Sequence, residues 1–221
     1  MNFRVSSLKK LLLLTLIFTL AEVSPSTALL ESIQSKTQSL KDLSSLKVKA
    51  KSYSVSYKRS AFGEAWLDVD KNDCDTRNDI LHRDLFQQVT SFSKGPCVIE
   101  SGKLLDPYTN KTISFTRGLT SSQAVQIDHI VSLANAWHTG AYLLSESKRV
   151  ELANDPIELL ATSAKANSSK SDLDASQWLP ENKSFYCSYA SLTIAVKKKY
   201  QLWVTKSEKA SLQNLLKYCK E

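Results

Sequence analysis

The chain has 221 residues, of which 42% are hydrophobic and 23% are charged, and its formal net charge is +7 at neutral pH. These values match ordinary globular proteins and exclude a chain that is disordered throughout. Five Gly and five Pro exclude collagen-like and linker-like chains. One or two domains with a substantial hydrophobic core are therefore expected.

The N-terminal segment has the pattern of a secretory signal. A basic stretch ending at Lys10 precedes an apolar run over residues 11–20, which is shorter than a membrane span of about 20 residues. Small residues ending at Ala28 indicate cleavage there; cleavage after Ala21 and an uncleaved anchor are the alternatives. We therefore expect a signal peptide over residues 1–28 and a secreted or extracytoplasmic protein with no stable membrane association.

In the first half, spaced leucines among polar residues predict a helical or flexible tether over residues 29–51, outside the main core. Alternating apolar residues predict a strand over residues 51–58. One apolar face predicts a helix over residues 78–89. Two short apolar runs, 97–99 and 112–115, predict a hairpin with a long loop.

The second half alternates short strands with helices and ends in two helices. Strands are predicted over residues 125–131 and 159–161, and helices over residues 133–144, 145–153, 164–170, 182–200 and 205–217. The last helix begins with the capping box Thr205-Lys-Ser-Glu208. The order of elements predicts an α+β fold.

Four cysteines follow the signal segment, and an even number in an exported chain indicates two disulfides. Three pairings are possible. The pairs Cys74–Cys97 and Cys187–Cys219 are favoured because each joins residues within one local unit. A four-cysteine zinc site is the alternative, and the absence of any Cys-x-x-Cys spacing argues against it.

Positive charge is concentrated at the C-terminal end. Residues 181–221 hold eight Lys and three Glu, which is all of the net positive charge left after signal removal. A one-sided basic surface favours a polyanionic partner, such as nucleic acid or an acidic wall polymer. A solvated lysine face is the alternative on charge alone.

Among the three histidines, His129 stands out because Asp128 precedes it within an apolar strand. Neighbouring strand residues face opposite sides, so the pair can serve two adjacent functions at the end of a strand. A carboxylate binds a hard cation, and an imidazole accepts a proton near neutral pH. Asn167 adds an amide oxygen on the helix after the second strand, with Lys170 on the same helix face. The two predicted strands and the helix after them would bring these side chains together across a narrow groove.

Several motifs in order carry a resemblance to a known family. They are Asp128-His-Ile-Val131, Ala153-Asn-Asp-Pro156, Asn167-Ser-Ser-Lys-Ser-Asp172 and Trp178-Leu-Pro180, preceded by Phe62-Gly-Glu-Ala-Trp66, Cys74-Asp-Thr-Arg-Asn78, Asp106-Pro-Tyr108 and Gln126-Ile-Asp-His129. Over residues 52–219 the chain resembles the secreted HNH endonucleases with a DUF1524 domain. That domain is related to the C-terminal part of GmrSD-type restriction enzymes.

The resemblance implies a nuclease domain over residues 52–221, with a ββα-metal (HNH) core at about residues 124–172, an N-terminal β-rich part and C-terminal helices. His129 matches the general base. Asp128 and Asn167 match the protein ligands of a divalent ion, for which Mg²⁺ is expected. Because all three take part in the implied reaction, they form the predicted catalytic set.

Two further groups of residues have implied or open roles. Lys170 is expected to contact the substrate phosphate. Arg77 either binds phosphate or forms a buried ion pair that supports the disulfide, and the structural role is favoured. Glu158 stands where many relatives carry an Asn that helps hold the base. Three possibilities follow: Asn154 holds the base, Glu158 itself holds it, or no residue does. The tryptophans are interpreted as core residues.

The resulting hypothesis is metal-dependent hydrolysis of nucleic acid phosphodiester bonds outside the cytoplasm by a monomer, with DNA favoured over RNA. The second hypothesis is a catalytically inactive HNH scaffold that binds nucleic acid or another polyanion. A third is a hydrolase acting on an acidic wall polymer. For that third class, a His-Glu-x-x-His zinc motif is absent from the sequence.

Overall fold

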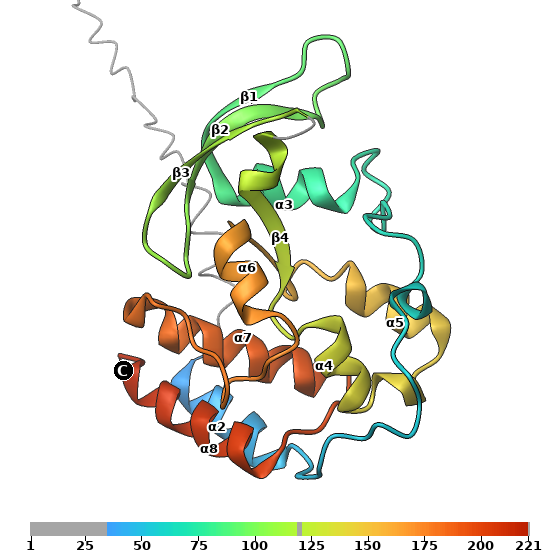
Figure 1. Ribbon diagram of the computed structural model, residues 1–221, viewed down its shortest axis with the longest axis vertical. Helices are drawn as coiled ribbons and strands as arrows, with labels where there is room; N and C mark the ends of the chain where they lie inside the picture. Colours follow the sequence, from blue (N-terminus) through green and yellow to red (C-terminus); the bar gives the residue numbers. More distant parts are fainter. Residues whose placement is uncertain (1–34, 119–120, 221) are drawn as a thin grey trace, which may run out of the picture.

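Two small antiparallel sheets and the helices around them make up the computed structural model (Figure 1). The structure describes residues 35–118 and 121–220, and the predicted signal peptide over residues 1–28 lies outside them. The predicted α+β class is confirmed. In Figure 1 the three-stranded sheet lies at one end of the molecule, a helical layer lies at the other, and β4 and α6 lie between them.

The three-stranded sheet has the order β1-β2-β3, from β1 (Leu85–Thr90), β2 (Ile99–Leu105) and β3 (Thr112–Thr116). Its β2–β3 pair confirms the predicted hairpin. Helix α3 (Thr76–Asp84) precedes β1 and is capped by the Asp75 carboxylate, which accepts from the Asn78 amide nitrogen. The predicted helix over residues 78–89 is therefore wrong beyond Asp84. Pairing of β1 with β2 overrides the local helix preference there.

The second sheet contains only β4 (Val125–His129) and β5 (Leu159–Ser163), which pair antiparallel with Asp128 opposite Leu160. Helix α6 (Ala164–Lys170) starts directly after β5, where the Ser163 side chain accepts from Ala166 N. This helix packs against both strands. The predicted order of strand, strand and helix is thus observed, with the two strands and α6 in direct contact.

The connection between β4 and β5 is helical. It contains α4 (Leu133–His138), the 3-10 turn Ala141–Leu143 and α5 (Glu146–Ala153). One continuous helix was expected over residues 133–144, but Gly140 has φ +128° and interrupts it. A Cβ on Gly140 would lie 3.0 Å from the Trp203 ring, so this glycine also permits close packing.

A helical layer closes the other end, formed by α2 (Lys36–Ser45), α7 (Tyr186–Lys199) and α8 (Lys206–Leu215). The predicted capping box at Thr205 and Glu208 is present at the start of α8. Helix α2 falls within the predicted tether, yet Leu43 and Leu46 are buried in the main core. The expectation that this segment lies outside the core is therefore wrong, because its spaced leucines cover α7 and α8.

Both predicted disulfides are present. Cys74–Cys97 joins the start of α3 to the approach to β2, and Cys187–Cys219 joins α7 to the end of the chain. Each closes a local unit, as the spacing indicated. Among the described residues, no cysteine is left unpaired, which agrees with two structural cross-links rather than a zinc site.

The predicted strand over residues 51–58 is wrong, since this segment pairs with no sheet. Its alternating tyrosines instead pack on α4: the Tyr57 ring lies 6.4 Å from the Trp137 ring and the Tyr53 ring 4.4 Å from the His138 ring. The alternation therefore reflects contact with a helix. Within residues 35–118 and 121–220, no helix has the length and apolar character required to cross a bilayer.

Candidate active site

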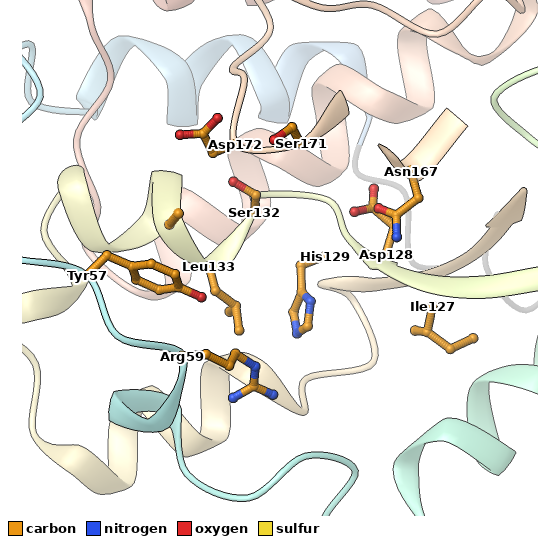
Figure 2. A pocket seen from close by; sticks show the side chains of 11 residues that line it. Tyr57, Arg59, Ile127, Asp128, His129, Ser132, Leu133, Asn167, Ser171 and Asp172 are labelled. Atoms are coloured by element: carbon orange, nitrogen blue, oxygen red, sulfur yellow. The ribbon is translucent and has the colours of Figure 1, made fainter. Parts of the chain in front are cut away.

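A cleft of about 310 Å³ opens at the C-terminal end of β4 (Figure 2). It is bounded by β4, the start of α4, α6 and the extended segment before residue 60. Its lining includes Tyr57, Arg59, Asp128, His129, Ser132 and Asn167. The three residues of the predicted catalytic set therefore meet in one cleft.

Neighbouring residues of β4 face its two sides. Gln126 and Asp128 share the side covered by α6, because Asn167 on that helix donates to Gln126 and Lys170 to Asp128. His129 lies on the other side, where its ring is nearly parallel to the Trp66 ring at a centroid distance of 6.4 Å. The alternation of one short strand thus separates the candidate base from the candidate metal ligand.

The His129 imidazole is held in one tautomer. Its Nε2 lies 3.0 Å from the Ala153 carbonyl oxygen, and a carbonyl only accepts, so Nε2 carries the hydrogen. In the neutral ring, Nδ1 then has a free lone pair. The pKa of His129 is lowered to about 4, chiefly by burial; the Ala153 hydrogen bond opposes this shift, and the charges of Arg59 and Lys170 contribute to it. The half-buried ring is therefore a neutral proton acceptor at physiological pH.

The Ala153 carbonyl is positioned by the end of α5. Asn154 caps this helix: its backbone nitrogen donates to Glu151 O, and its Nδ2 donates to Val150 O at 3.0 Å. The next residue, Asp155, accepts from Tyr200 and Lys199 at 2.6 Å each. The turn that presents Ala153 is thus fixed to the C-terminal end of α7.

Glu158 supports the backbone after the base instead of the imidazole itself. Its Oε2 accepts from Val131 N at 3.1 Å, and its backbone oxygen accepts from Ile130 N at 2.7 Å. The side chain is fully buried, and burial raises the pKa of Glu158 well above its usual value. Asn154 and Glu158 therefore support different parts of the site, since Asn154 helps present the carbonyl to His129 and Glu158 fixes residues 130 and 131.

Asp128 lies in a buried network below the cleft. Tyr108 donates to its Oδ2 at 2.6 Å, and the Lys170 ammonium lies 3.0 Å from each carboxylate oxygen. Lys170 also donates to the His129 carbonyl oxygen at 2.7 Å. Because Lys170 is fully buried, its ammonium does not face the cleft, and the expected contact with a substrate phosphate does not fit this geometry.

The Asp106-Pro-Tyr108 motif positions Tyr108 for its hydrogen bond to Asp128. Asp106 is fully buried and its Oδ1 accepts from Tyr108 N at 3.1 Å and from Thr162 Oγ1 at 2.7 Å. This ties the turn to β5. Burial raises the pKa of Tyr108 well above its usual value, with the nearby Asp128 charge adding to the shift, so the hydroxyl remains a donor.

Asn167 reaches the cleft from α6. Its Nδ2 donates to Gln126 Oε1 at 2.8 Å, which leaves the amide oxygen as the free accepting end. Among the described residues, no three His, Cys, Asp or Glu side chains are grouped to hold a metal. The two predicted ligands, which line the same cleft, would offer one carboxylate and one amide oxygen. Such a set fits Mg²⁺, which keeps several waters, and does not fit zinc.

Arg77 is remote from the cleft lining and has a structural contact. Its Nη2 donates to the Val125 carbonyl at 3.2 Å, at the start of β4. Burial lowers the pKa of Arg77, and the charge of Arg117 lowers it further. Its contact therefore supports the strand that carries the candidate base, in line with the favoured structural interpretation.

Sequence reasoning missed Tyr108 and Ala153 as partners of the site, and it missed Tyr57 and Arg59 as cleft residues. Tyr108 did lie in a motif shared with the resembled family, so a signal was available. Ala153 acts through its backbone oxygen, and because every residue has one, the residue type gave no signal of this role. Tyr57 lay in the segment predicted to be a strand and Arg59 directly after it, and neither carried a signal that it lies in the cleft with His129.

Comparison with known proteins supports the resemblance carried by the motifs. The chain matches the family described as GmrSD restriction endonucleases, C-terminal domain, over residues 75–215. A protein of Arthroderma benhamiae named "Uncharacterized secreted protein" is 34% identical over 187 residues, which is 84% of this chain and 85% of the relative. No solved structure matches. The secreted relative confirms the expected secreted or extracytoplasmic location, and the chain belongs to the GmrSD C-terminal domain family.

Proposed function

We propose that this protein is a metal-dependent endonuclease that hydrolyses phosphodiester bonds of nucleic acid outside the cytoplasm, with DNA favoured over RNA. In this proposal β4, β5 and α6 are a ββα-metal core of the HNH type. The observation that carries the proposal is the His129 ring, fixed by Ala153 and open to the cleft that Asp128 and Asn167 also line. Membership in a restriction endonuclease domain family supports the same class of reaction.

In the proposed reaction, His129 accepts the proton of the attacking water at Nδ1. Its Nε2–H remains bonded to Ala153, which keeps the ring orientation as positive charge develops. The depressed pKa keeps the ring neutral before the reaction, so the base is available across the physiological pH range. The buried network of Tyr108 and Lys170 keeps Asp128 in one orientation.

Asp128 and Asn167 are the residues that would hold the divalent ion. When bound, Mg²⁺ supplies electrostatic stabilisation of the phosphate and of the leaving oxygen. Both Asp128 oxygens accept from protein donors, so this carboxylate is already oriented, and its charge is balanced by Lys170. Lys170 is thus proposed as a positioning residue for Asp128 instead of a substrate ligand.

A second candidate is an HNH scaffold that binds nucleic acid without cleaving it. The observation in its favour is that Lys170 already neutralises Asp128, as a scaffold without a metal requires. The replacement of the usual Asn by Glu158 points the same way. The two candidates differ in one respect that is simple to measure, because only the enzyme nicks DNA in a chelator-sensitive way.

The test is nicking of supercoiled plasmid DNA by the purified secreted chain with Mg²⁺, with and without EDTA. The proposal predicts nicking that EDTA abolishes and that His129→Ala lowers about 10²–10⁴-fold. His82→Ala is the matched control, since His82 is exposed in the last turn of α3 and away from the cleft. Equal activity of the two variants would remove His129 as the base, and binding without nicking would favour the scaffold.

A further inference from the structure

We propose that Arg59, delivered by the N-terminal segment 57–66, binds the scissile phosphate beside His129. This inference rests on the proposed nuclease function and adds a substrate-binding residue to it. Arg59 lines the cleft, and Figure 2 shows it on the side of the His129 ring away from Asp128 and Asn167. A phosphate between these groups would contact a cation on one side and the candidate metal ligands on the other.

The segment that carries Arg59 is anchored on the core. Phe62 is fully buried, with its ring 6.0 Å from Trp137. Gly63 has φ +73°, and a Cβ there would lie 2.6 Å from Val150 on α5, so glycine is needed for this close approach. Arg149 Nε also donates to the Ala61 carbonyl at 2.6 Å. These contacts of residues 61–63 with α4 and α5 fix the 3-10 turn Arg59–Phe62 at the edge of the cleft.

The charge of Arg59 is available to a ligand. Its side chain is exposed, and Nη1 donates to the Gly63 carbonyl at 3.2 Å. Across residues 35–118 and 121–220, Arg59 forms no ion pair with a carboxylate. By contrast, the Lys170 ammonium is fully buried and bonded to Asp128. Of these two cations near His129, Arg59 is the one that can reach a phosphate.

The electrostatics of the cleft also favour an anion at this position. Burial raises the pKa of Tyr57, and the Arg59 charge opposes this shift, so the guanidinium acts on another group that lines the cleft. Guanidinium geometry suits phosphate oxygens in a paired hydrogen-bonded contact.

Arg59 precedes the part of the chain that matches the family. The family match begins at residue 75, so Arg59 lies outside the matched domain. The segment nevertheless contributes Tyr57 and Arg59 to the cleft lining and brings the Trp66 ring to 6.4 Å from the His129 ring. Trp66 has φ +63°, an uncommon conformation for a bulky residue. The functional unit is therefore larger than the matched domain.

The test compares Arg59→Gln with Lys58→Ala in the full secreted chain. Glutamine keeps a donor for the Gly63 carbonyl but removes the charge, while Lys58 is an exposed neighbour that does not line the cleft. Binding of fluorescein-labelled duplex DNA is measured in EDTA, where no turnover occurs, and plasmid nicking is measured with Mg²⁺. Thermal unfolding of each variant checks that both fold as the wild type does.

We expect Arg59→Gln to weaken DNA binding in EDTA and to lower kcat/KM about 10²-fold, with Arg59→Lys restoring part of both. Lys58→Ala should remain close to wild type at matched salt. Equal DNA binding by Arg59→Gln and Lys58→Ala would overturn the inference, whether or not the wild type cleaves DNA. A wild type that binds DNA through Arg59 but never nicks it would support the contact between Arg59 and a DNA phosphate and would overturn the nuclease function instead.

Discussion

Two buried ion pairs of the same chemistry lie in different regions of the molecule. Lys170 pairs with Asp128 at 3.0 Å beneath the cleft, and Lys197 pairs with Glu208 at 2.8 Å between α7 and α8. Both lysine side chains are fully buried. The two pairs differ mainly in their surroundings, and these surroundings distinguish a structural ion pair from one that belongs to a candidate site.

The Lys197–Glu208 pair is buried and bonded to other groups of the core. Lys197 also donates to Asn135 Oδ1 and to the Trp203 carbonyl, and Glu208 completes the capping box of α8. The carboxylate of Asp128 instead reaches the lining of the cleft that contains His129. Burial of an ion pair therefore does not identify a functional site. The distinguishing feature is that one partner of the pair, Asp128, lines a cleft that also contains a candidate base, His129.

The same comparison changes the interpretation of the basic C-terminal region. Lys197 is buried, and Lys199 is bound to Asp155 at 2.6 Å. Only part of the positive charge of residues 181–221 is thus available at the surface, and the run Lys197-Lys-Lys199 is not one continuous basic face. A nucleic acid partner is better supported by the cleft than by this run.

The largest effect is expected when each of the two lysines is removed in turn. Lys170→Met and Lys197→Met each leave a buried carboxylate unpaired, which should lower the free energy of unfolding by about 3–5 kcal/mol in EDTA. Added Mg²⁺ should raise the Tm of Lys170→Met more than that of Lys197→Met, because both variants keep Asp128 and Asn167 but only in Lys170→Met does the ion also replace a lost charge beside Asp128. An equal response of both variants to Mg²⁺ would contradict the assignment of Asp128.

A smaller effect is expected when the orientation of Asp128 is disturbed without a change of charge. Tyr108→Phe removes one hydrogen bond to the carboxylate and should lower the free energy of unfolding by about 1.5–3 kcal/mol. Nicking per folded molecule should fall as well. Tyr189→Phe is the control, since Tyr189 is equally buried beside Tyr108 and donates to no carboxylate in the described part of the chain. Equal nicking by the two variants would show that Tyr108 does not position the site.

The smallest effect is expected at a third, less buried pair, Lys51–Asp174, in which Lys51 is 16% exposed. Burial alone would raise the pKa of Asp174, but hydrogen bonds from Ser176 and the Lys51 charge outweigh it and lower the pKa below the ordinary 3.8. The ionised form therefore stabilises the fold above pH 3.8, and this contribution is lost as the pH falls through the lower folded-state pKa.

Asp174→Asn should accordingly lower the free energy of unfolding by about 1 kcal/mol at pH 7, because partial exposure weakens the pair. The difference from wild type should shrink below pH 3.8. Urea unfolding at a series of pH values measures it. A difference that stays constant down to about pH 2 would mean that the charge of Asp174 contributes nothing to stability.

Local signals in the sequence were sufficient for much of the fold. The capping box of α8, the two local disulfides and the order β4, β5, α6 were predicted, and each depends on residues close together in the chain. The pairing of Asp128 with His129 on an apolar strand likewise identified the cleft, since period-two alternation is a local property.

Long-range contacts were beyond such reasoning. Residues 85–90 became a strand because β2 was available for pairing, and the tyrosines before residue 58 alternate because α4 lies beneath them. In the site, the burial of Lys170 depends on Tyr108 and Asp128, which come from separate parts of the chain. Arg59 lines the same cleft as His129 because Phe62 and Gly63 fix their segment on α5 and the core.

The most direct test of the proposed site is an anomalous difference map from crystals of the protein grown with MnCl₂, because Mn²⁺ takes the oxygen ligands that Mg²⁺ prefers. The proposal predicts a peak within bonding distance of the Asp128 carboxylate and the Asn167 amide oxygen, on the cleft side of β4. A protein that nicks DNA with Mn²⁺ but shows its manganese elsewhere, with Asp128 still bonded only to Lys170 and Tyr108, would contradict it.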